Sequence, residues 1–80
     1  MKLSIHSLNK TLFQGEAEKI VTRTTEGQIC VMKNHIPLIS SLIASRLDII
    51  EANGKKNGIK IRSGFIEVRP KNEVVILAEI

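Results

Sequence analysis

The chain has 80 residues, 42% of them apolar, with both signs of charge interspersed; this excludes a disordered chain and allows one modest hydrophobic core. Its net charge of +4 raises nucleic acid as a class of partner, although only Phe13 and Phe65 are aromatic and could stack on bases. The single cysteine, Cys30, excludes an intramolecular disulfide and is predicted to be a small core or sheet residue. No apolar run approaches the roughly 20 residues of a membrane span.

The first third of the chain predicts strands. Leu3 and Ile5 alternate with polar neighbours, which is the pattern of a strand with one buried face and argues against a signal peptide. The segment 17–23 is rich in β-forming residues, but the pattern does not distinguish its two faces. Gly15 and Gly27 are predicted to mark chain reversals.

Residues 36–50 allow two interpretations. Apolar residues recur here at three- and four-residue spacing, which is typical of an amphipathic helix, and Pro37 suits a first helical turn. Three serines and several β-branched isoleucines favour strands instead, because these residues are poor helix formers. The pattern alone leaves both interpretations open.

The last third returns to alternation. The segments 59–62 and 66–69 each present one apolar face. Residues 74–78 are apolar on both faces, which predicts a strand that is covered on both sides or that closes a sandwich. Asn53-Gly54 and Asn57-Gly58 are predicted to form tight hairpin turns, because Asn-Gly readily adopts positive φ angles.

Pro70-Lys71-Asn72 separates the last two predicted strands, because the proline ends ladder pairing. Many short strands with regular turns predict an all-β sandwich or barrel, here a single domain over residues 1–80 with less than about a tenth of helix.

No residue pattern points to catalysis. His6 and His35, with one cysteine, lack the spacing of a zinc site, and neither a glycine-rich phosphate loop nor a Gly-x-Ser-x-Gly elbow is present. Glu16 and Glu18 share one face of a strand and are expected to form a solvated edge. We therefore predict no catalytic, cofactor-binding or metal site and no enzymatic activity.

His35 has two possible roles. It precedes Ile36-Pro37, and the proline restricts the chain before it, so the corner could present an imidazole rigidly to a partner. Alternatively, His35 is a turn histidine that is hydrogen-bonded to the backbone.

The basic residues also allow two interpretations. Four of them cluster around one predicted turn and two near another, namely Lys55, Lys56, Lys60 and Arg62, and Arg69 and Lys71. They are either solvated side chains or the surface of a small basic β-barrel nucleic-acid-binding protein, which is the alternative function.

Two segments carry a family resemblance. The run 26–38 places a Glu-Gly turn before a short apolar strand and the corner Asn34-His35-x-Pro37-Leu38, and a second match runs through Ser63–Val68, Asn72 and Val74–Ala78. Together they resemble the amino-terminal β-domain of the F-type ATP synthase epsilon subunit. Ser63 stands where the family commonly has the first glycine of a pair, and Cys30 where glycine often precedes the valine.

The resemblance implies an antiparallel β-sandwich of two packed sheets. It favours a strand and corner at 36–44 and a second strand at 46–52, in place of a helix. It also implies a non-catalytic rotor subunit that joins the gamma subunit to the c-ring during proton- or sodium-driven ATP synthesis.

Contact residues follow from positions that match the family. Ser7, His35 and Ser40 fall where the family contacts the gamma subunit, and we expect them on one contiguous surface. Glu26 and Gln28 fall in the turn that faces the polar loops of the c-ring, and we expect them on an adjacent edge.

The resemblance further implies no cofactor, no nucleic-acid partner and no homo-oligomer. Membrane association is expected only through partner subunits, on the cytoplasmic face of a bacterial inner membrane or its organellar equivalent. The sequence stops at Ile80, before the carboxy-terminal helices to which the family's ATPase inhibition is attributed, so we expect coupling without inhibition.

Overall fold

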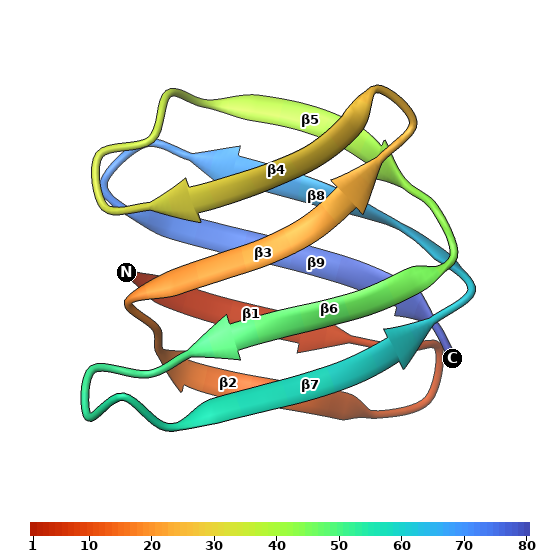
Figure 1. Cartoon of the computed structure of the whole chain (residues 1–80), viewed down its shortest axis with the longest axis horizontal. Helices are drawn as coiled ribbons and strands as arrows, with labels where there is room; N and C mark the ends of the chain where they lie inside the picture. Colours follow the sequence, from red (N-terminus) through yellow and green to blue (C-terminus); the bar gives the residue numbers. More distant parts are fainter.

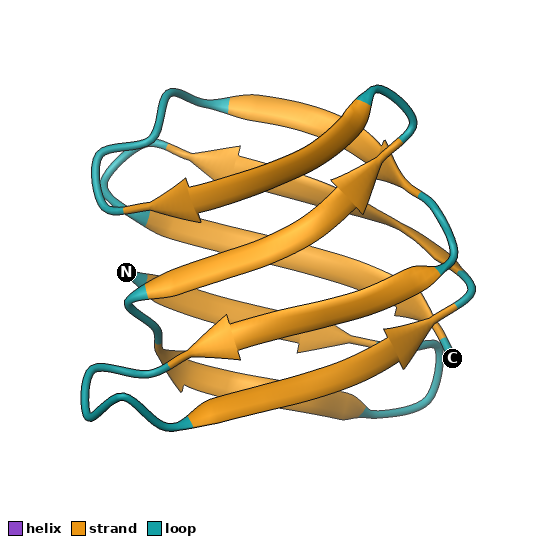
Figure 2. Ribbon diagram, viewed as in Figure 1, coloured by secondary structure: helices purple, strands orange, loops and turns teal.

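The computed structural model describes all residues from 1 to 80 and contains strands and loops but no helix, which confirms the all-β fold class (Figures 1 and 2). The strands are β1 (Lys2–His6), β2 (Thr11–Glu16), β3 (Lys19–Thr24), β4 (Gly27–Met32), β5 (Leu38–Leu42), β6 (Ser45–Ile50), β7 (Lys56–Ile61), β8 (Ser63–Arg69) and β9 (Glu73–Glu79).

The strands lie in two facing layers. One layer has the order β4-β3-β6-β7 and the other the order β5-β8-β9-β1-β2 (Figure 1). The layers join where Thr24 of β3 pairs with Leu42 of β5, so the hydrogen-bonded order continues as one strongly curled sheet. All pairs are antiparallel except β1 with β9, which run parallel.

The core fills the space between the layers. Because side chains alternate along a strand, each predicted apolar face turns inward, as Leu3 and Ile5 of β1 do with no exposed surface. The buried apolar residues are Leu3, Ile5, Ala17, Ile20, Val31, Leu42, Leu47, Ile49, Ile61, Ile66, Val68, Val74, Ile76 and Ala78. In β3 the inward residues are Ile20, Thr22 and Thr24. Within 17–23 the polar Thr22 faces inward and the apolar Val21 faces outward, which explains why the pattern did not distinguish the two faces.

Residues 36–50 form strands β5 and β6, and the helix interpretation is wrong. The residues at helical spacing do not form one buried stripe: Ile36 and Ile39 are 73% and 75% exposed, whereas Leu47 is fully buried. Strand β6 instead buries Leu47 and Ile49 at a spacing of two. The strands are shorter than the segments 36–44 and 46–52 that we predicted.

Two of the predicted chain reversals, at Asn57-Gly58 and at Gly15, do not form. Gly54 does turn the chain between β6 and β7, with φ +87°, but Asn57-Gly58 lies inside β7. The guanidinium of Arg46 lies across Gly58, so this glycine makes room for a side chain. Gly15 likewise lies within β2 and is not a reversal. The turns at Gly27 and at 70–72 form where predicted.

Strand β9 is covered on one side only. Val74, Ile76 and Ala78 face the core, whereas Leu77 faces outward and is 56% exposed. This corrects the expectation of a strand covered on both sides. Cys30 is a sheet residue of β4, but it is exposed and lies outside the core.

Candidate functional site

An apolar surface lies on the outer side of the layer that contains β5, β8 and β9. It consists of Ile39, Phe65 and Leu77, which are 75%, 58% and 56% exposed, together with half-buried Val75; we call these four residues the apolar face. Phe65 and Leu77 are cross-strand partners, and Ile39 lies on the next strand. Contiguous exposed apolar surface of this kind marks interaction sites in soluble proteins.

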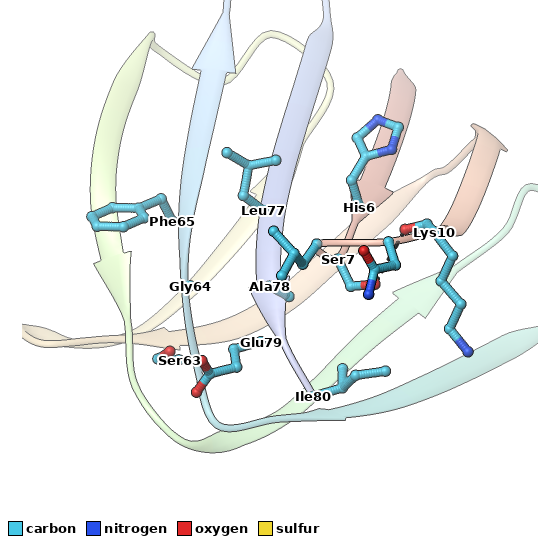
Figure 3. A pocket seen from close by; sticks show the side chains of 12 residues that line it. His6, Ser7, Lys10, Ser63, Gly64, Phe65, Leu77, Ala78, Glu79 and Ile80 are labelled. Carbon is cyan, nitrogen blue, oxygen red and sulfur yellow. Dashed lines mark hydrogen bonds between the residues drawn. The ribbon is translucent and has the colours of Figure 1, made fainter.

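Two hollows shape this surface. A small one of about 140 Å³ is lined by the apolar face together with Ile66 and Glu67. A larger, open one of about 810 Å³ extends from Phe65 and Leu77 to the β1–β2 turn, where His6 and Ser7 line it (Figure 3). At its rim Leu8 is 96% exposed and Ile80 49% exposed, which adds apolar surface at this end.

A charged group borders the opposite end of the apolar face. Arg69 of β8 contacts Glu67 at 3.1 Å and Glu73 of β9 at 3.3 Å. Hydrogen bonds to the carboxylates of Glu73 and Glu67 raise the pKa of Arg69 above its ordinary value. The guanidinium holds both carboxylates beside the β8–β9 turn.

Ser7 and His35 lie at opposite ends of this layer. Ser7 follows β1, its hydroxyl donates to the carbonyl of Lys10 at 3.3 Å, and it lines the larger hollow. His35 lies in the corner between β4 and β5, beside the β8–β9 turn. Because β1 runs parallel to β9, the two residues are separated by about the length of β9, with the apolar face between them.

Ser40 faces a different way. It pairs with buried Ile66 in the β5–β8 ladder, so its side chain lies on the side of β5 that faces the other layer. It is half-buried, whereas its neighbours Ile39 and Ser41 are exposed on the outer side. The structure therefore does not bring Ser40 onto the apolar face with Ile39.

Glu26 and Gln28 lie at the β3–β4 hairpin, and both are exposed. The hydroxyl of Thr24 accepts a hydrogen bond from the backbone N–H of Glu26 at 3.1 Å and donates to the carbonyl of Gly27 at 3.0 Å. These bonds define the turn conformation. Gln28 pairs with Arg23 on the outer side of this hairpin, at the end of β4 that is distant from His35.

The imidazole of His35 is fixed to its own corner. Its backbone N–H donates to the carbonyl of Met32 at 3.1 Å, and ring Nδ1 lies 2.7 Å from the carbonyl oxygen of Ile36. Because a carbonyl only accepts, Nδ1 carries the proton and Nε2 is left for another contact. The structure thus shows a turn histidine that is hydrogen-bonded to the backbone, and the role of His35 as a partner contact stays a prediction.

The apolar face does not follow from the sequence pattern alone. Ile39 belongs to a segment whose pattern allows either a helix or strands, and Phe65 is singled out there only as an aromatic residue and as part of the family match. The one signal is that residues 74–78 are apolar on both faces, which also fits a strand that is covered on both sides or that closes a sandwich.

The basic residues near β6 and β7 do not surround an aromatic side chain. Lys55 lies in the β6–β7 turn, and Lys56 and Lys60 are exposed on β7, an edge strand. Phe65 belongs to the other layer, and Phe13 packs against the core. This arrangement gives no stacking platform for bases.

No group of three His, Cys, Asp or Glu side chains is placed to hold a metal ion. None of the chain forms a helix long and apolar enough to cross a membrane.

The family model for the β-sandwich domain of the ATP synthase delta/epsilon chain matches residues 1–80. The ATP synthase epsilon chain of Shouchella clausii is 37% identical over 79 residues, which are 99% of this chain and 58% of that protein. That of Clostridium novyi is 37% identical over 78 residues, 98% of this chain and 59% of that protein. The chain thus spans less than two thirds of these relatives.

Solved structures show the same fold. A chain of the Euglena gracilis mitochondrial ATP synthase (OSCP/F1/c-ring) superposes with a TM-score of 0.90 at 26% identity, covering 95% of this chain and 48% of that one. A chain of the Tetrahymena thermophila mitochondrial ATP synthase central stalk/c-ring gives a TM-score of 0.83 at 14% identity, which supports the fold alone, and covers 99% of this chain and 63% of that one. Because the family model matches it from end to end, the chain belongs to the family of the ATP synthase delta/epsilon chain β-sandwich domain.

Proposed function

We propose that this chain is a non-catalytic central-stalk component of a rotary ATP synthase, where it joins the gamma subunit to the c-ring. Membership of the delta/epsilon chain family supports this assignment. In this role the chain holds partners together during proton- or sodium-driven ATP synthesis, and the chemistry belongs to other subunits. Through those partners it would associate with the cytoplasmic face of a bacterial inner membrane or the organellar equivalent.

The exposed apolar face is the observation that carries the proposal. A lone domain gains nothing from placing Ile39, Phe65 and Leu77 more than half exposed on one side of a sheet. Covering them with a partner removes apolar surface from water, and large side chains at the centre of an interface contribute most to affinity. We assign this face to the gamma subunit.

Ser7 and His35 extend the gamma-facing surface at its two ends. Ser7 lines the hollow next to Phe65 and Leu77, and His35 offers ring Nε2 from the β4–β5 corner. Ser40 is proposed to contact the same partner because its position matches the family. Its half-buried side chain faces the other layer, so the partner would reach it from the edge of β5 opposite β8.

Glu26 and Gln28 are proposed to contact the c-ring. They project from the β3–β4 hairpin at the far end of β4 from His35, so a second partner could be engaged without displacing the first. Exposed polar side chains at a turn suit recognition of polar loops, where a charge acts locally.

The docking assignment is tested by titrating the chain with the gamma subunit of the same enzyme in a calorimeter. We expect Leu77→Ser and Phe65→Ser each to weaken binding about 10- to 100-fold, because each removes a central apolar contact. Val21→Ser is the control: Val21 is half-buried on the outer side of β3, in the other layer and away from the His35 corner. Equal losses for Val21→Ser and Leu77→Ser would contradict the assignment.

A second pair of variants distinguishes binding to the gamma subunit from binding to the c-ring. His35→Glu is expected to weaken gamma binding by about 1–3 kcal/mol if His35 is a central contact. Glu26→Lys is expected to weaken attachment to the c-ring and to leave gamma binding nearly unchanged. Pull-down of c-ring and calorimetry with gamma measure the two effects, and loss of gamma binding in Glu26→Lys would refute the division.

A further inference from the structure

Backbone strain is concentrated where the β4–β5 corner meets the β8–β9 turn. The non-glycine residues with positive φ are Asn34 (+67°), Lys71 (+64°) and Asn72 (+57°), and all of them lie at this junction. Positive φ is uncommon outside glycine, and asparagine tolerates it better than most residues. Two of the three residues are asparagines, so the junction retains side chains that can also form hydrogen bonds.

One hydrogen bond connects the two segments. The backbone N–H of Asn34 donates to Oδ1 of Asn72 at 2.6 Å, across 38 positions of sequence. The remaining hydrogen bonds of residues 33–37 stay local, to Met32 and Ile36. The Asn72 side chain is therefore the only hydrogen-bonding link between this corner and a segment distant in the sequence.

The acceptor itself is held in place. The carbonyl of Asn72 accepts a hydrogen bond from the backbone N–H of Lys2 at 2.8 Å, which ties the β8–β9 turn to β1. Arg69 and Glu73, the residues on either side of the turn, pair in the ladder and are joined by an ion pair. Oδ1 of Asn72 thus projects from a well-fixed part of the same layer that carries the apolar face.

Because the His35 ring and main chain are bonded to Ile36 and Met32, the imidazole follows the position of the corner. We infer that Asn72 is a positioning residue: its side-chain oxygen holds the β4–β5 corner so that His35 is presented in register with the apolar face. This inference rests on the proposed gamma docking. In that complex Asn72 acts through the corner, without contacting the partner itself.

The test uses two substitutions at Asn72 that separate the acceptor from the backbone conformation. Asn72→Gly keeps the positive φ and removes the acceptor, whereas Asn72→Asp keeps an acceptor oxygen. Lys71→Gly is the control, because it places glycine at the neighbouring positive-φ position without removing a hydrogen bond. Amide hydrogen exchange and the NMR signals of the His35 ring are measured on each free chain, and gamma affinity by calorimetry.

In Asn72→Gly we expect exchange of the Asn34 amide to accelerate about two- to tenfold and gamma affinity to fall by a similar factor, as for the loss of one hydrogen bond. Asn72→Asp should restore both, and Lys71→Gly should change neither. Unchanged Asn34 exchange and His35 signals in Asn72→Gly would overturn the inference, as would a fall in affinity that Asn72→Asp does not restore. If the unaltered chain does not bind gamma, the proposed docking fails, and exchange with the ring signals still decides whether Asn72 fixes the corner.

Discussion

The two buried threonines of β3 differ in what their hydroxyl groups contact. Thr24 Oγ1 is bonded to both Glu26 and Gly27 in the β3–β4 turn. Thr22 Oγ1 is buried without any hydrogen-bond partner. A buried hydroxyl without a partner loses its hydration and gains nothing in return. The same side chain therefore stabilises the fold at one position and destabilises it two residues earlier.

We expect Thr22→Val, which keeps the shape and removes the orphaned hydroxyl, to raise the free energy of unfolding by about 1 kcal/mol. Thr24→Val should lower it by about 1–2 kcal/mol, because the turn loses two hydrogen bonds. Urea denaturation of both variants measures whether the free energy of unfolding rises or falls in each. Equal destabilisation by the two substitutions would show that the Thr22 hydroxyl is satisfied in solution.

The burial of single residues follows from the sequence wherever polar and apolar residues alternate cleanly along a strand. Leu3 and Ile5 are buried as expected, because one face of β1 packs on the core. Thr22 could not be placed, since threonine is common on either face of a strand and its hydroxyl gives no sign of burial. The contact roles of Ser7, Ser40 and Gln28 remain predictions, because they depend on partners.

At the scale of elements, Gly64 of β8 lies close against the backbone of β9. A Cβ at this position would collide with the backbone carbonyl oxygen of Leu77 and lie 3.2 Å from Cα of Ala78. Gly58 in β7 is different, because a Cβ there would meet only the side-chain end of Arg46. A backbone carbonyl in a ladder cannot move aside, whereas an exposed guanidinium can.

Gly64→Ala is therefore expected to cost about 2–3 kcal/mol of unfolding free energy, as for overpacking against a fixed neighbour. Gly58→Ala should cost less than about 1 kcal/mol, since the exposed Arg46–Asp48 ion pair that it disturbs contributes little. Thermal unfolding distinguishes the two variants. If Gly58→Ala lowers the unfolding free energy as much as Gly64→Ala does, the close contact of Gly64 with β9 does not explain the loss of stability.

The predictions for elements failed where local signals compete with packing. Residues 36–50 carry apolar residues at helical spacing, yet Ile36 and Ile39 are exposed. Ile36 lies in the corner where the chain passes from one layer to the other, and Ile39 lies on the outer side of β5. Asn57-Gly58 has the composition of a hairpin turn, but the Asn53-Gly54 turn already reverses the chain, and Gly58 accommodates Arg46. Only the tertiary arrangement distinguishes such cases.

At the scale of the molecule, the two outer sides of the sandwich differ. The layer β4-β3-β6-β7 presents charged residues such as Lys56 and Lys60, which also protect the edge strand β7 from pairing with another chain. The layer with β5, β8 and β9 presents the apolar face. This asymmetry is what the proposed docking requires, because only the apolar face would gain from being covered by a partner.

The most direct test of this division is methyl cross-saturation NMR on the labelled chain in complex with unlabelled gamma subunit. We expect the methyl signals of Ile39 and Leu77 to be attenuated most strongly, because the apolar face is covered by the partner. The methyl signals of Val21, on the outer side of β3 in the other layer, should keep their intensity. Strong attenuation at Val21 with unaffected signals at Ile39 and Leu77 would contradict the proposal that the apolar face is the docking surface.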